Sequence, residues 1–183
     1  MARILVLFGT NYGQTRKIAR RIAEAIRQRD HQVEMLQGNK ISDSFSPDGF
    51  EAAIIGTSIY MGQHQISVRK LVKQHKGSFN RIPTAYYCVC LTATSNESKD
   101  QKQVAQFIQD FLSYTGLQPV HTGAFAGALR YPHYNFFRRY MAKLVARKVG
   151  ADTNTKKELH EYTDWVAVDK FASDFLNKLD CGL

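Results

Sequence analysis

The residues best suited to chemistry lie in the loop GTNYGQT, residues 9–15, which follows an apolar run and opens a helical pattern. A helix N-terminus offers unpaired N–H groups and a positive dipole end, and both favour a phosphate. Thr10 and Thr15 add hydroxyl donors, and Gly13 lets the backbone approach a ligand closely. The spacing matches neither G-x-x-x-x-G-K-S/T nor G-x-G-x-x-G. The loop therefore predicts a site for one phosphate, with a plain strand-to-helix turn as the simpler alternative.

The elements around this loop alternate between short apolar strands and amphipathic helices, which predicts an α/β fold with a parallel sheet. Five strands are expected, at residues 3–8, 32–36, 51–59, 85–93 and 120–127. Helices are expected at about 14–29, 67–75, 98–114 and 164–179. The simplest architecture is a single domain with a doubly wound five-stranded sheet, in either the flavodoxin-like strand order or that of a Rossmann-type half.

The helix ends and the first strand carry local signals of their own. Ser98 and Gln101 form a plausible capping box, and Thr163 or Asp164 can cap the last helix. The first apolar run leads into a Gly-rich turn without a small-residue cleavage pattern. We therefore interpret it as a strand rather than a signal peptide.

In a doubly wound sheet, ligands bind outside the carboxyl ends of the strands. Three stretches leave those ends, at residues 9–15, 58–64 and 92–97. Tyr60 in the second could cover an aromatic ring, although an ordinary loop aromatic is an equal alternative. Thr92 in the third offers a hydroxyl and neighbouring backbone amides. These stretches predict one composite site at a single edge of the sheet.

The charge of the chain is high and uneven. The 183 residues carry a formal net charge of +9, and no acidic residue lies between Asp110 and Asp152. Such a basic stretch suggests an anionic partner, which could be a membrane surface, an acidic small molecule or nucleic acid. Cys88 and Cys90 share one strand face, which favours buried thiols over a disulfide or a metal site. We expect no metal site.

Residues 127–160 form an insertion that is too long for an ordinary connection after the fifth strand. Apolar residues recur at helical spacing within it, with cations mostly on the other side. Such a helix suits a surface with anionic lipid, or a substrate that joins carboxylates to a large apolar ring. A crossover helix packed on the core is the third alternative.

The sequence TNYGQT resembles the flavodoxin phosphate loop, S/T-x-x-G-x-T, which in that family wraps the 5′-phosphate of FMN. This sequence has a tyrosine where that family more often has a third threonine. The resemblance implies flavin contacts from the loops after the third and fourth strands as well. The FMN-binding residues that it implies are Thr10, Asn11, Tyr12, Gly13, Gln14, Thr15, Ser58, Ile59, Tyr60, Met61, Gly62, Leu91, Thr92 and Ala93.

Three further stretches, YGQTRKIA, AGALRYP (126–132) and EYTDW (161–165), together resemble the menaquinone-dependent protoporphyrinogen IX dehydrogenases, a flavodoxin-like family. This resemblance covers essentially the whole chain. It implies FMN as cofactor, protoporphyrinogen IX as electron donor and a respiratory quinone as acceptor, in haem biosynthesis. It also implies an oxidoreductase acting on CH–CH groups. Such a protein would be peripheral, on an anionic membrane surface at the cytoplasmic side of the inner membrane.

A tetrapyrrole with propionate arms favours arginine, because a planar guanidinium binds carboxylates in a bidentate manner. The substrate-binding candidates are Arg130, Tyr131, Arg138 and Arg139. No catalytic residue is assigned, and His64, His121 and His133 are possible proton carriers or ordinary packed histidines.

Two other functions stay open at this point. One is a flavin electron carrier or quinone reductase without porphyrinogen activity. The other, a nucleic-acid-binding protein, is not expected, because the basic helix lacks a groove-reading motif.

Overall fold

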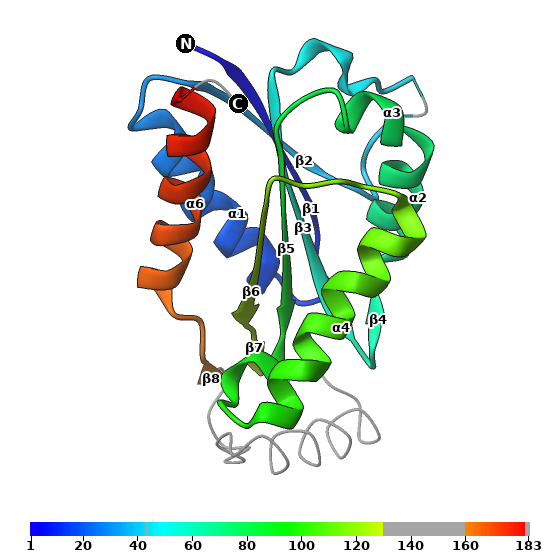
Figure 1. Cartoon of the computed structure of the whole chain (residues 1–183), viewed down its shortest axis with the longest axis vertical. Coiled ribbons are helices and arrows are strands. Elements are labelled where there is room, and N and C mark those ends of the chain that lie inside the picture. Colours follow the sequence, from blue (N-terminus) through cyan, green and yellow to red (C-terminus); the bar gives the residue numbers. More distant parts are fainter. Residues whose placement is uncertain (43, 130–159, 182–183) are drawn as a thin grey trace.

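A computed structural model describes residues 1–42, 44–129 and 160–181. Its centre is a parallel sheet with the strand order β2-β1-β3-β5-β6 (Figure 1). This is the flavodoxin-like order, so the predicted fold is confirmed and the Rossmann-type alternative is excluded. The strands are β1 (Arg3–Gly9), β2 (Gln32–Gln37), β3 (Ala52–Tyr60), β5 (Thr84–Cys90) and β6 (His121–Ala126).

Helices cover both faces of this sheet, as a doubly wound topology requires (Figure 1). On one face lie α1 (Gln14–Arg27) and α6 (Trp165–Asp180). On the other lie α2 (Ile66–Gln74), α3 (Lys76–Phe79) and α4 (Ser98–Thr115).

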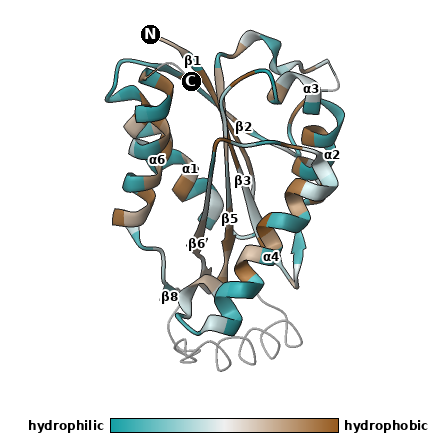
Figure 2. Cartoon of the chain, viewed as in Figure 1, coloured by the Kyte–Doolittle hydropathy of each residue, from teal (hydrophilic) through white to brown (hydrophobic). Residues whose placement is uncertain are grey.

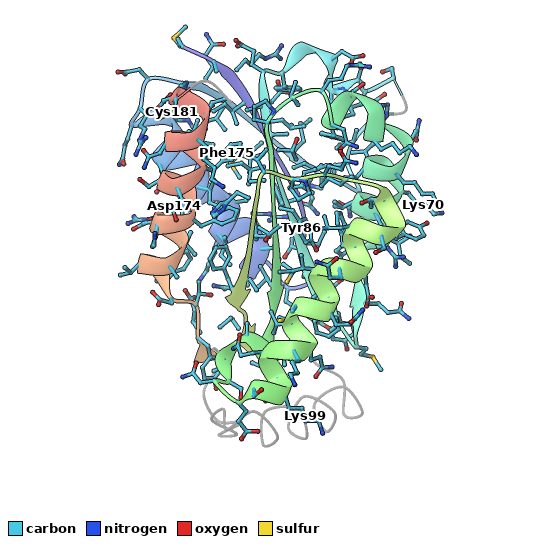
Figure 3. All side chains as sticks on the ribbon, viewed as in Figure 1. Lys70, Tyr86, Lys99, Asp174, Phe175 and Cys181 are labelled. Atoms are coloured by element: carbon cyan, nitrogen blue, oxygen red, sulfur yellow. The ribbon has the colours of Figure 1, made fainter. Side chains whose placement is uncertain are left out.

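The core divides into one apolar layer on each face, because alternate residues of a strand point to opposite sides. In β1, Val6 packs toward α1 and α6, and Leu7 packs toward α2 and α4. Figure 3 shows Phe175 on the first side and Tyr86 on the second. The strands are mostly hydrophobic in Figure 2, and the helices carry hydrophilic residues outward. The sheet is thus a rigid platform whose carboxyl edge can position loops.

The third strand ends one residue later than predicted and turns back on itself. Residues 60–64 were expected to lie beyond the strand, in the loop 58–64, but Tyr60 belongs to β3, and β4 (Gln63–His64) pairs in antiparallel fashion with Ile59 and Tyr60. Met61 and Gly62 form the two-residue turn, with φ of 49° and 75°. Two positive φ values match the twist of a tight hairpin. The prediction of a loop here was wrong because no Asn-Gly or Asp-Gly pair announces the turn.

Two predicted element boundaries need correction. The Ser98–Gln101 capping box does not form: Glu97 is the N-cap of α4, and its N–H bonds to Ser95 Oγ at 3.2 Å. Gln101 instead donates to the Ser95 carbonyl at 2.5 Å. The fourth predicted strand ends at Cys90, because residues 91–94 wind into a 3-10 turn.

At the last helix, Asp164 is the cap, and its Oδ1 accepts from the N–H of Ala167 at 3.1 Å. Thr163, the alternative cap, bonds elsewhere.

The two described ends of the predicted insertion lie together. β7 (Ala128–Leu129) pairs in antiparallel fashion with β8 (His160–Glu161), so that Ala128 lies opposite Glu161. Both short strands lie at the carboxyl edge of the main sheet (Figure 1). Within the described ranges, no helix has the length and apolar character needed to span a bilayer.

Candidate cofactor site at the carboxyl edge of the sheet

The loop after β1 forms a turn with free N–H groups at the start of α1. Lys17 donates its N–H to the Gly13 carbonyl at 3.1 Å, so the amides of residues 14–16 precede the first N–H donor of the helical ladder and have no acceptor within the helix. Thr10 Oγ1 accepts from the N–H of Gly13 at 2.9 Å, which closes the loop. The hydroxyl proton of Thr10 remains available to a ligand, because a hydroxyl donates as well as accepts. The turn can therefore surround an anion.

Gly13 is required at this turn by its backbone conformation. It is the N-cap of α1 with φ of 92°, in the left-handed region that side chains disfavour. Apart from its two chain neighbours, no atom of the described residues lies within 4 Å of where a Cβ at this position would be. The positive φ, and not a collision with neighbouring protein atoms, therefore explains the glycine.

The residues at the start of α1 fit a phosphate group, and Thr15 provides the test. Its side chain is only 1% exposed, and Thr15 Oγ1 has no hydrogen-bond partner in the described parts of the chain. A buried hydroxyl without a partner is costly, and a phosphate oxygen would accept its proton. Gln14 Oε1 is also buried and unpaired among these residues, but as an acceptor it suits a water or hydroxyl donor.

The side chain of Gln14 bonds to residue 163 rather than to the loop after β1. Its Nε2 donates to Thr163 Oγ1 at 2.9 Å, in a buried contact. Gln14 was predicted among the phosphate-binding residues, and what it can offer an anion is its backbone N–H.

The predicted stretch 58–62 lies directly beside this loop. The rings of Tyr12 and Tyr60 meet edge to face, with centroids 5.7 Å apart. Gln65 joins the two stretches, because its Nε2 donates to Asn11 Oδ1 at 2.6 Å and to Ser58 Oγ at 3.2 Å. Sequence reasoning missed Gln65, since a lone glutamine before a helix carries no signal of such a role.

The third predicted stretch follows the neighbouring strand. Leu91, Thr92 and Ala93 are half-buried in the 3-10 turn after β5. Because β5 pairs with β3 in parallel, Ser58 lies opposite Val89 and the two strands end together. The structure therefore brings all three predicted FMN-binding stretches to one edge of the sheet.

His64 lies behind the hairpin in a closed polar network. Its Nδ1 is 3.1 Å from both Thr57 Oγ1 and the Tyr86 hydroxyl, which are 2.8 Å apart. Its Nε2 is 2.9 Å from the Phe107 carbonyl, which can only accept, so Nε2 carries the proton. His64 is 5% exposed, and burial lowers its pKa to about 4. A neutral, enclosed imidazole fixes the hairpin, which supports the packed alternative over a proton carrier.

The remaining predicted groups are placed as follows. His121 begins β6, at the opposite end of the sheet from the site, and burial lowers its pKa. Cys88 and Cys90 are buried free thiols, as predicted. His133 and the four substrate-binding candidates, Arg130, Tyr131, Arg138 and Arg139, lie outside the described residues. Over the ranges that the structure describes, no cluster of three or more His, Cys, Asp or Glu could hold a metal.

The strand order and the tight strand-to-helix turn after β1 define a flavodoxin-type protein. The family model for a flavodoxin domain matches residues 5–156. Two curated relatives are named protoporphyrinogen IX dehydrogenase [quinone]. The one from Escherichia coli (strain K12) is 33% identical over 97% of each chain. The one from Leishmania major is 34% identical over 94% of this chain and 74% of its own.

Among solved structures, a Fusobacterium nucleatum flavodoxin bound to flavin mononucleotide superposes with a TM-score of 0.52. The alignment covers 98% of each chain. Because the identity is only 12%, this similarity supports the fold alone. The chain belongs to the flavodoxin domain family and, within it, to the family of the relatives named protoporphyrinogen IX dehydrogenase [quinone].

Proposed function

We propose that this protein is an FMN-dependent oxidoreductase that oxidises protoporphyrinogen IX to protoporphyrin IX and passes the electrons to a quinone. One observation carries the proposal. A turn suited to a single phosphate, whose Thr15 hydroxyl has no partner among the described residues, occurs in a chain that aligns almost end to end with relatives bearing that activity in their name. A site for one phosphate suits FMN, and no second phosphate-binding pattern is present in the sequence.

The chain's own residues divide into two roles. The amides of residues 14–16 and the hydroxyls of Thr10 and Thr15 would hold the phosphate. Tyr60, held beside Tyr12, offers an aromatic face to the flavin ring, and residues 91–93 offer backbone groups from the third loop. The redox chemistry, repeated two-electron transfers, is supplied by FMN when it is bound. The protein's part is to bind and orient the reactants.

We further propose that the protein works in haem biosynthesis at the cytoplasmic side of an inner membrane, as a peripheral protein that uses a respiratory menaquinone. The net charge of +9 and the acid-free stretch 111–151 support an anionic surface as partner. Sedimentation with anionic vesicles should show binding that weakens as salt is raised, because salt screens such attraction. Equal binding to neutral vesicles at every salt concentration would contradict the electrostatic part.

The function is tested by turnover of the purified, FMN-loaded protein. Protoporphyrinogen IX is added without oxygen, with or without a soluble menaquinone analogue, and porphyrin fluorescence is followed. We expect repeated turnover only with the quinone. If the chemically reduced protein reduces the quinone but never oxidises porphyrinogen, the protein is an electron carrier or quinone reductase and the proposal is wrong.

A further inference from the structure

A cluster of polar side chains joins the first turn of α1 to residues 160–163, and the proposed chemistry does not account for it. Lys17 Nζ lies 2.6 Å from Glu161 Oε2, and Gln14 Nε2 donates to Thr163 Oγ1 at 2.9 Å. The partners are 144 and 149 positions apart in the sequence. We call these four side chains the clasp.

The hydrogen bonds of the clasp continue into the sheet. Thr163 Oγ1 donates to the carbonyl of Ala126, the last residue of β6, at 2.7 Å. A hydroxyl carries one proton, so the chain of donors runs from Gln14 through Thr163 to Ala126. Gln14 is 6% exposed and Thr163 is 9% exposed. Loss of the Thr163 hydroxyl would leave an amide N–H and a carbonyl unpaired and out of water, which is costly.

The ion pair of the clasp holds at neutral pH. Burial alone would raise the pKa of the Glu161 carboxyl, but hydrogen bonds from Lys17, Gln14 and Trp165 and the charge of Lys17 keep that pKa below its usual value. Glu161 is therefore ionised beside Lys17. It lies on β8, opposite Ala128, so the pair ties α1 to the β7–β8 ladder.

Residues next to the same ladder bond to the end of β5, directly before the third predicted flavin stretch. The N–H of Tyr162 bonds to the Gly127 carbonyl at 3.1 Å, and the N–H of Gly127 bonds to the Cys90 carbonyl at 3.2 Å. Cys90 directly precedes the 3-10 turn of residues 91–94. Residues 126–129 and 160–163, which we call the insertion base, thus bond to Gln14 of the first stretch of the cofactor site and to the residue that directly precedes the third.

We propose that the clasp residues are positioning residues that couple FMN binding to the arrangement of the insertion base. This inference rests on the proposed function. Gln14 is the first residue of α1, so its side-chain bond fixes the turn whose amides would contact the phosphate. Coupling between two sites is reciprocal. FMN that stabilises the turn therefore also stabilises the base, and a loosened base weakens FMN binding.

The test compares variants by titrating flavin-free protein with FMN and following flavin fluorescence. Thr163→Val should weaken binding about tenfold, the equivalent of roughly one hydrogen bond. Thr163→Ser, which keeps the hydroxyl, should stay within about twofold of the parent. Asp169→Asn is the matched control. It removes the Arg21–Asp169 pair at 2.7 Å, which joins α1 to α6 rather than to the insertion base and is exposed.

Hydrogen exchange of the insertion base gives the second readout. In the parent and in Thr163→Ser, FMN should slow hydrogen exchange at the backbone amides of residues 126–129 and 160–163. In Thr163→Val and Glu161→Gln, FMN should slow this exchange much less. Glu161→Gln changes the partly exposed Lys17–Glu161 pair, so this variant is used for the test if Thr163→Val does not fold. A folded Thr163→Val with parental FMN affinity, or no effect of FMN on the parental base, would overturn the inference alone. A parent that binds no FMN would overturn the proposed function as well.

Discussion

At the scale of single residues, loss of the Thr15 hydroxyl should lower the affinity for FMN without lowering the stability of the flavin-free protein. Thr15→Val removes, at nearly constant volume, a buried hydroxyl that has no partner in the part of the chain that the structure describes. FMN affinity should fall by about ten- to a hundredfold, because a hydrogen bond to a charged group contributes roughly 1.5–3 kcal/mol. The flavin-free protein should be as stable as the parent or more stable, since an unsatisfied buried group is gone. Flavin titration and urea unfolding measure the two effects, and Thr15→Ser is the control. Unchanged affinity would remove Thr15 from the phosphate site.

His64 gives a pH dependence of stability whose sign follows from its pKa. The folded pKa is about 4, below the ordinary 6.5, so the unfolded chain binds the proton more readily. Stability should be full above about pH 6.5 and fall as the pH drops toward 4, by at most about 3 kcal/mol. Urea unfolding at several pH values should show this loss in the parent and a smaller loss in His64→Gln. If the free energies of unfolding of the two proteins fell equally over that pH range, the lowered pKa of His64 would be contradicted.

At the scale of elements, the pattern of the sequence predicted the five strands of the parallel sheet, the four longer helices and the turn after β1, because each depends on local periodicity or on one glycine. The pattern did not predict the short helix α3. It also did not predict the hairpin of β3 and β4. Met61 has a positive φ of 49° and is 67% exposed, and a methionine gives no signal of such a turn. The network of His64, Thr57 and Tyr86 that fixes the hairpin was equally hidden, since it joins side chains from different strands.

The hairpin turn yields a stability prediction. Asparagine tolerates the left-handed region better than methionine and is favoured before glycine in such turns. Met61→Asn should therefore raise the free energy of unfolding of the flavin-free protein by about 0.5–1 kcal/mol. Gly62→Val, at φ of 75°, should lower it by about 1–2 kcal/mol. Urea unfolding of the flavin-free parent and of the two variants measures these changes. A destabilised Met61→Asn would show that the turn conformation is not the one described.

At the scale of the whole molecule, the strand order could be narrowed from the sequence to two alternatives, and the structure selects one. Contacts between distant segments could not be predicted. YGQTRKIA and EYTDW stood out as separate motifs, and the structure joins them through Gln14 with Thr163 and Lys17 with Glu161. Local periodicity carries no information on pairs almost 150 positions apart. Their common presence in one family resemblance was the only available signal.

The insertion gives the prediction that belongs to this scale. At the base of the insertion, β7 and β8 pair with each other. The residues between these two strands can therefore be shortened while both strands are retained. Replacing residues 132–155 with a brief Gly/Ser linker should leave FMN bound, because the three cofactor stretches lie outside it. Porphyrinogen turnover should fall sharply, and reduction by dithionite should persist. Parental turnover would place the substrate elsewhere, and loss of FMN would make the segment part of the cofactor site.

The central claim is that electrons pass from a porphyrinogen through this protein's FMN to a quinone. The most direct measurement mixes FMN-loaded protein with protoporphyrinogen IX in a stopped-flow cell without oxygen, follows the flavin absorbance, and then adds a menaquinone analogue. The account predicts that the flavin absorbance bleaches while porphyrin forms, and that the quinone restores it. Flavin that stays oxidised in the presence of excess porphyrinogen, yet bleaches with dithionite, would contradict the account.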